Sequence, residues 1–178
     1  MNVEENKQSP EPLVFRSGFQ ILSTQLTECE KIMSSLAEKV PTQLVILLEK
    51  SGQIISHVGK CDHFDLIAFG SLISADLAAS KAIAEYSEEY QDTQTILREG
   101  KLFDTLICEA SEQLILFVQF STQISLGWAR LLVKEAVVKI TRAMLTSPTE
   151  ESAEVPKPPQ DHKISDAIED RLKEIWKQ

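Results

Sequence analysis

The chain has 178 residues, 43% of them hydrophobic, which is enough for one folded domain with appendages and too many for a disordered protein. Its 27 acidic and 18 basic side chains give a net charge of −9, which argues against nucleic-acid binding, because phosphate contacts need a basic surface. The longest aliphatic run, Leu44–Leu48, is far shorter than the ~20 residues of a membrane span. With no secretory leader and only three cysteines, we expect a cytoplasmic protein with reduced thiols and no membrane insertion.

The placing of the prolines predicts how the chain is divided. All seven lie outside the stretch from Thr42 to Ser147, and proline is excluded from the interiors of helices and sheets. Polar composition and proline content set the remaining boundaries. The predicted segments are a flexible arm (1–16), a folded domain (17–146), a proline-rich linker (147–163) and an amphipathic C-terminal helix (164–178).

The folded domain is predicted to begin with a helix and two strands. Ser17 followed by Gln20 has the pattern of a capping box. Apolar residues then recur at spacings of three and four as far as Val40, and Pro41 ends the helix. The next run, 44–48, is apolar on both faces, as a central strand is, and residues 53–59 return as a second strand after a Ser-Gly turn.

Asp62 is predicted to cap a second helix over residues 64–89. One face is apolar and is expected to cover the core: Leu66, Phe69, Ile73 and Leu77. Another face consists of small residues: Ser71, Ala75, Ala78, Ala79 and Ala82. Small side chains let a second helix approach closely, but alanine is also simply a good helix former, and the sequence does not decide between the two.

Three more strands are predicted at 93–98, 102–110 and 114–120. The first is polar and should lie at a sheet edge, whereas the last is apolar on both faces and should be central. Ser125 then caps a third helix with a net charge of +3, for which a solvated face is favoured over an anion-docking surface. The order helix, two strands, helix, three strands, helix predicts an α+β sandwich with a mainly antiparallel five-stranded sheet flanked by three helices.

Motifs of enzymatic chemistry are missing from the sequence. There is no glycine-rich phosphate loop, no nucleophile elbow and no zinc-protease motif. His57, Cys61 and His63 form a metal-like cluster, but their spacing matches no standard zinc pattern, so an ordinary strand-end loop is favoured over a metal or a Cys-His nucleophile. We therefore expect no catalytic residue, metal or cofactor.

The C-terminal segment carries an apolar stripe after the linker. Its residues recur at helical spacing: Ile164, Ile168, Leu172, Ile175 and Trp176. A helix of this length is marginal in water alone. The segment is therefore expected to need a partner surface.

Several stretches together resemble the roadblock/dynein light-chain family, most of all its bacterial MglB type. The first stretch is 44–56, a hydrophobic strand followed by a Gly turn and Gln-Ile-Ile-Ser. The second is 125–131, with Ser-Leu-Gly at a helix start, and the third is 164–168, which follows a Pro-containing linker. The resemblance covers Phe15 to Met144 and implies a roadblock-type α/β sandwich.

The resemblance also implies a homodimer and a partner. In the family the second helices pack together and edge strands pair, which here places Ser71, Ala75, Ala78, Ala79, Ala82, Thr93, Thr95 and Leu97 in a dimer interface. The implied partner is a Ras-like small GTPase of the MglA type. The resemblance implies that the dimer accelerates GTP hydrolysis by this partner, by repositioning the GTPase's own catalytic residues and without an arginine finger. It also implies a setting of cell polarity and motility. The candidate contacts to the GTPase are Arg98, Ile164, Ile168, Leu172 and Trp176.

Two other functions remain open at this point. A roadblock-type adaptor or scaffold dimer would bind a partner without affecting nucleotide hydrolysis. A small-molecule sensor or an enzyme on a similar frame would need a pocket with convergent polar groups, and the sequence offers no such cluster. We therefore expect a regulator or a scaffold and not an enzyme.

Overall fold

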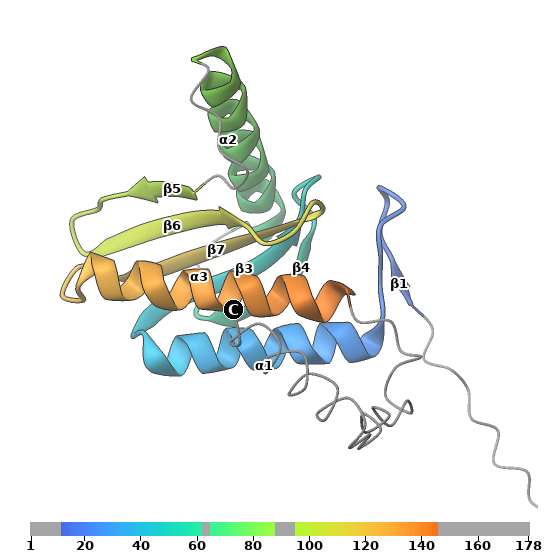
Figure 1. Ribbon diagram of the computed structural model, residues 1–178, viewed down its shortest axis with the longest axis horizontal. Helices are drawn as coiled ribbons and strands as arrows, with labels where there is room; N and C mark the ends of the chain where they lie inside the picture. The colour runs from blue at the N-terminus through green and yellow to red at the C-terminus, as the bar shows by residue number, and fades with distance from the viewer. Residues whose placement is uncertain (1–11, 62–64, 88–94, 146–178) are drawn as a thin grey trace, which may run out of the picture. The chain divides into compact units, whose positions relative to one another are not determined.

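The computed structural model describes residues 12–61, 65–87 and 95–145 (Figure 1). Within these ranges the elements are β1 (Leu13–Val14), β2 (Gln20–Ile21), α1 (Ser23–Lys39), β3 (Thr42–Glu49), β4 (Ile54–Gly59), α2 (Leu66–Tyr86), β5 (Thr95–Arg98), β6 (Phe103–Glu109), β7 (Leu114–Ser121) and α3 (Leu126–Leu145). The predicted fold class is confirmed. Residues 1–11 of the predicted arm, the linker and the C-terminal helix lie outside the described residues, whereas residues 12–16 of the arm are described and contain β1. The division into segments therefore stays a prediction.

The main sheet has five antiparallel strands in the order β4-β3-β7-β6-β5. As predicted, the two strands that are apolar on both faces, β3 and β7, lie inside it, and β5 lies at an edge. In their register Ile46 faces Phe117 and Leu47 faces Leu116. A strand buried on both faces shows no alternation of apolar and polar residues, because every position needs an apolar side chain.

Two cores lie on opposite faces of this sheet. Helices α1 and α3 lie side by side against one face, and α2 lies on the other (Figure 1). Along β3, Val45 and Leu47 point into the α1–α3 core, whereas Ile46 and Leu48 point into the core beneath α2. The small number of residues in the second core means that α2 is held by a short stretch of its length.

The predicted start of the first helix is wrong. Ser17 does not cap a helix; it lies in a hairpin in which Leu13 pairs with Ile21, and its hydroxyl accepts a bond from the backbone N–H of Phe19. Gly18 has a φ of +85° in this turn, a conformation that suits glycine and disfavours a continuing helix. Helix α1 begins at Ser23 instead, and its apolar stripe holds from there onward.

The start of the second helix also moves, while the third is where it was predicted. Asp62 lies outside the described residues, and Asp65 is the cap: its Oδ1 accepts bonds from the backbone N–H groups of Ile67 (3.0 Å) and Ala68 (3.2 Å). Two carboxylates three residues apart are equivalent capping candidates in the sequence, and the sequence alone does not separate them. Helix α3 begins directly after Ser125, as predicted.

Candidate functional site

The first turns of α2 are seated on the turn between β3 and β4. Gly70 of the helix faces Gly52 of the turn so closely that a methyl group on Gly70 would overlap the Gly52 carbonyl oxygen. A Cβ on Gly52 would in turn lie 2.8 Å from the Ser71 Cα. Two glycines are therefore required for this backbone contact, which fixes where α2 leaves the sheet.

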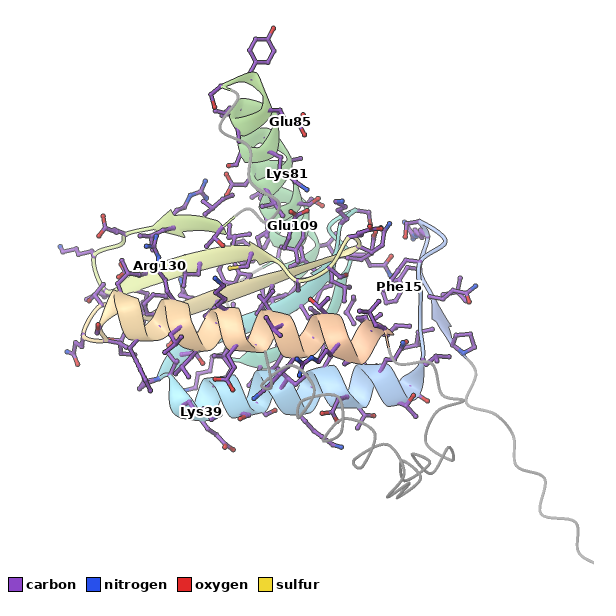
Figure 2. The ribbon with its side chains drawn as sticks, viewed as in Figure 1. Phe15, Lys39, Lys81, Glu85, Glu109 and Arg130 are labelled. Atoms are coloured by element: carbon purple, nitrogen blue, oxygen red, sulfur yellow. The ribbon has the colours of Figure 1, made fainter. Side chains whose placement is uncertain are left out.

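Further along α2, the apolar face meets the sheet as predicted. Phe69 packs edge-on against Phe117, with ring centroids 5.1 Å apart, and Ile73 and Leu77 are buried. The last anchor is an ion pair of Lys81 with Glu109 of β6. Figure 2 shows Lys81 reaching toward Glu109, with Glu85 farther along the part of α2 that projects beyond the sheet.

The opposite face of α2 is exposed. All five small residues predicted for an interface are exposed there: Ser71, Ala75, Ala78, Ala79 and Ala82. Large apolar side chains flank them, namely Ile67, Leu72, Ile83 and Tyr86, with exposed fractions of 67–95%. A contiguous apolar patch of this kind marks an interaction surface.

Sequence reasoning missed the large apolar members of this face. The signal was present in the sequence, because α2 has large apolar residues on both of its faces. A helix that is apolar all round is normally covered all round. Ser71 keeps its hydroxyl satisfied within the helix by donating to the Ile67 carbonyl (3.0 Å), so it does not need water at a contact. We call the nine exposed residues of α2 named above (Ser71, Ala75, Ala78, Ala79, Ala82, Ile67, Leu72, Ile83 and Tyr86), together with strand β5, the α2–β5 surface.

Strand β5 supplies an open edge. It pairs with β6 on one side, with Thr95 opposite Cys108, and no strand within the described residues pairs with its other side. Thr95 is exposed, whereas Leu97 packs against the α1–α3 core, so that Leu97 offers its backbone and not its side chain. Thr93 lies outside the described residues. An open edge of this kind is a template for pairing with another strand.

Arg98 links the edge strand to the helix. Its Nη2 lies 2.5 Å from Oδ1 of Asp76 on α2. The other carboxylate oxygen of Asp76 is buried and has no hydrogen-bond partner among the described residues. The guanidinium of Arg98 is therefore engaged within the chain. The other candidate GTPase contacts, Ile164, Ile168, Leu172 and Trp176, lie outside the described residues.

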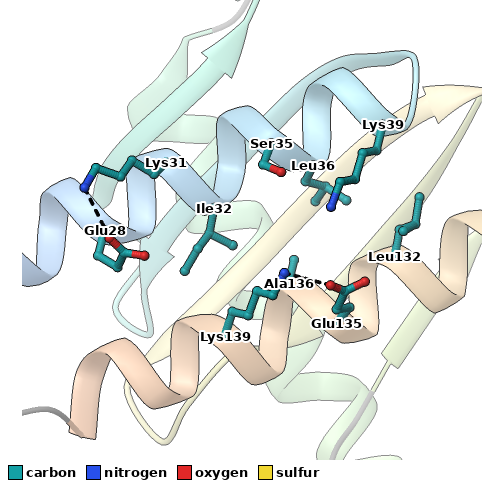
Figure 3. A pocket seen from close by; sticks show the side chains of 10 residues that line it. All are labelled: Glu28, Lys31, Ile32, Ser35, Leu36, Lys39, Leu132, Glu135, Ala136 and Lys139. Carbon is teal, nitrogen blue, oxygen red and sulfur yellow. Dashed lines mark hydrogen bonds and ion pairs between the residues drawn. The ribbon is translucent and has the colours of Figure 1, made fainter.

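The groove between α1 and α3 does not have the character of a ligand site (Figure 3). Its volume is about 300 Å³, and four of its five charged residues pair along their own helices, Lys31 with Glu28 (3.4 Å) and Lys139 with Glu135 (2.7 Å); Lys39 is the fifth. The hydrogen bond from Lys139 holds the pKa of the Glu135 carboxyl below its ordinary value. Among the described residues no group of three His, Cys, Asp or Glu side chains could hold a metal ion.

Helix α2 is also long and apolar enough to cross a membrane, judged by length and composition only. Its contacts favour another explanation for its apolar surface. Asp76 and Lys81 form ion pairs with the neighbouring strands β5 and β6, and removing the helix from the sheet would leave these charges unpaired, which is costly in lipid. A protein partner covers the same surface without breaking them.

The fold has clear counterparts among solved structures, although no family model and no curated protein sequence matches the chain. MglB of Myxococcus xanthus is 25% identical, with a TM-score of 0.63 over 67% of this chain and 96% of that one. The gliding protein MglB of Thermus thermophilus is 18% identical, with the same TM-score over 69% and 93%.

A roadblock/LC7 domain of Streptomyces avermitilis is 17% identical, with a TM-score of 0.59 over 65% of this chain and 97% of that one. The matched share of each known structure is nearly its whole length, so the likeness extends over a complete domain. The resemblance found in the sequence is thereby confirmed: the chain has the fold of the roadblock family and is similar to MglB.

Proposed function

We propose that the protein is a homodimeric regulator of a Ras-like small GTPase of the MglA type, and that it accelerates GTP hydrolysis. The observation that carries this proposal is the α2–β5 surface, an exposed apolar helix face beside an open edge strand, on a fold similar to MglB. A second copy that covers this surface removes the apolar side chains of α2 from water and gives the open backbone edge of β5 a partner.

The two features fit a two-fold contact. Such a contact uses the same patch twice, so each part must complement itself. Strand β5 can pair antiparallel with its own copy, which would join two five-stranded sheets. The small residues Ala75 and Ala79 allow the two α2 helices to approach closely, and the larger Leu72 and Ile83 pack beside them. The dimer interface proposed on these grounds contains Ser71, Ala75, Ala78, Ala79, Ala82, Thr93, Thr95 and Leu97.

The regulation of the GTPase is proposed to work by repositioning the GTPase's own residues. Arg98 is held by Asp76, and Arg130 and Arg142 lie on α3, so no arginine of these three is free to insert from a loop. Arg16 lies in the β1–β2 turn and is the described arginine best placed for such an insertion. The C-terminal residues Ile164, Ile168, Leu172 and Trp176 are proposed as a tethered second contact to the GTPase.

Mixing the full chain with the small GTPase encoded in the same genomic neighbourhood should raise single-turnover GTP hydrolysis at least about tenfold. Substituting Arg98→Ala or Arg16→Ala should keep the rate within about threefold of the unsubstituted protein, because an arginine finger contributes ~10³–10⁵ and its loss would be unmistakable. Phosphate release is the measurement. Binding without acceleration would select the scaffold function, and a return to the basal rate of the GTPase in either variant would contradict the proposed mechanism.

Deleting residues 148–178 should leave the folded domain intact and weaken the acceleration of GTP hydrolysis. Both described core clusters are built from residues 19–144, so we expect the melting temperature to change by less than about 4 °C, which corresponds to less than ~1 kcal/mol. Calorimetry and the same phosphate-release assay test the two parts. A large loss of stability would show that the tail is structural.

A further inference from the structure

A thiol and an imidazole lie in contact at the sheet edge opposite β5. His57 lies on β4 opposite Ile46, which places its ring on the α2 face of the sheet. Cys61 follows the end of β4, and its Sγ is 3.2 Å from Nε2 of His57. His57 is exposed, and Cys61 is half-buried against the core beneath α2. The sequence alone indicates an ordinary loop here, because it does not show that the strand end folds Cys61 back onto His57.

The two remaining cysteines have the opposite environment. Cys29 is fully buried, and burial raises the pKa of its thiol to about 11. Cys108 has an exposed fraction of 6%, and burial raises the pKa of its thiol too. The thiolate is the reactive form of cysteine, and a thiol reaches it most readily when it is accessible and beside a base. Of the three thiols, Cys61 alone meets both conditions.

We propose that Cys61 is a site of reversible modification, at which small disulfides react to form a mixed disulfide with the protein. In this step Nε2 of His57 takes the proton of the Cys61 thiol, and the thiolate attacks one sulfur of the disulfide. A new sulfur–sulfur bond forms as the old one breaks, and the leaving thiolate takes the proton from the imidazolium. Cys61 is oxidised and the leaving sulfur is reduced, so the exchange needs no other reactant.

The position of this site gives the modification a structural context. The Cys61 side chain is half-buried against the core beneath α2. Asp65, which caps that helix, follows only four residues later in the chain. An adduct at Cys61 therefore sits at the base of the element that carries the α2–β5 surface. The proposal itself does not depend on the dimer or on the GTPase, because it concerns the chemistry of one thiol.

The reduced full chain, treated with glutathione disulfide at neutral pH, should acquire one glutathionyl group, and peptide mapping should place it on Cys61. Cys29 and Cys108 should stay unmodified in the folded chain and react after unfolding in urea, which shows that the mapping detects all three. Modification of Cys29 or Cys108 as fast as Cys61 in the folded chain would overturn the proposal.

The role of His57 is tested by His57→Gln, which should lower the second-order rate at Cys61 about tenfold. This is less than the ~10²–10⁴-fold of a finished active site, because the pair is partly open to solvent. Lys60→Gln is the matched control: it removes an exposed charge next to Cys61 and should change the rate by no more than about twofold. Equal rates in His57→Gln and the unsubstituted chain would overturn the proposal. If His57→Gln fails to fold, Cys61 of the unsubstituted chain is compared before and after urea, and a faster reaction in the folded chain supports it.

Discussion

The variant Ala79→Asp should be monomeric at concentrations where the unsubstituted chain is a dimer. Ala79 is exposed on α2, so an aspartate there leaves the fold of one copy unaffected. In the proposed dimer the two-fold axis brings two such carboxylates into an apolar seam without partners. An unpaired buried charge costs ~3–5 kcal/mol, so the dissociation constant should rise at least about 10²-fold. Ala75→Asp should have the same effect.

Light scattering and sedimentation equilibrium measure this change directly. Ser34→Asp is a matched control, because it adds the same charge to an exposed position of α1 outside the α2–β5 surface. The control should stay dimeric, and all three variants should keep a cooperative melting transition, which shows that each copy is still folded. A dimer of unchanged affinity in Ala79→Asp would show that α2 does not form the seam. Loss of the dimer should also abolish the acceleration of GTP hydrolysis.

The variant Gly70→Ala should be destabilised by about 1–2 kcal/mol, and its melting temperature should fall by several degrees. The added methyl overlaps the Gly52 carbonyl oxygen, so α2 must lift from the β3–β4 turn or the turn must move. Overpacking of this kind costs typically ~1–3 kcal/mol, and the better helix propensity of alanine returns up to ~1 kcal/mol. Urea unfolding gives the free energy of unfolding.

Gly127→Ala provides the matched comparison. Gly127 is also helical, but a methyl group there meets only the Ser125 Oγ, at 3.9 Å. The same substitution should therefore be neutral or stabilising by a few tenths of a kcal/mol through helix propensity. Gly70→Ala behaving like Gly127→Ala would mean that the backbone contact between the turn and α2 is absent in solution.

Most of the fold could be predicted because its elements carry strong periodic signals. The apolar runs of β3 and β7 predict central strands, and the three- and four-residue spacing from Leu22 to Val40 predicts α1. The hairpin of Leu13–Ile21 could not be predicted, because its strands are two residues long and have no periodicity to detect. The register and the strand order depend on long-range packing and are likewise invisible in the local sequence.

The candidate site was predictable only in part. The small residues of α2 and the polar edge strand are visible in the sequence. The structure places the small residues on an exposed helix face and the described part of the strand, Thr95–Arg98, at an open sheet edge. The ion pair of Arg98 with Asp76 and the contact of Cys61 with His57 join residues whose relation depends on the fold. Such pairs have no sequence signature, because their distance is set by the elements between them.

The pairing of β3 with β7 also determines how the chain can fold. Each strand has a local antiparallel neighbour, β4 for β3 and β6 for β7, so two hairpins can form early. Joining them brings Ile46 beside Phe117, 71 positions apart in sequence (117 − 46), and contacts of such separation slow folding. Until that step is complete, the two most apolar strands each keep an unpaired edge. The slowest step of folding is thus also the one most exposed to aggregation.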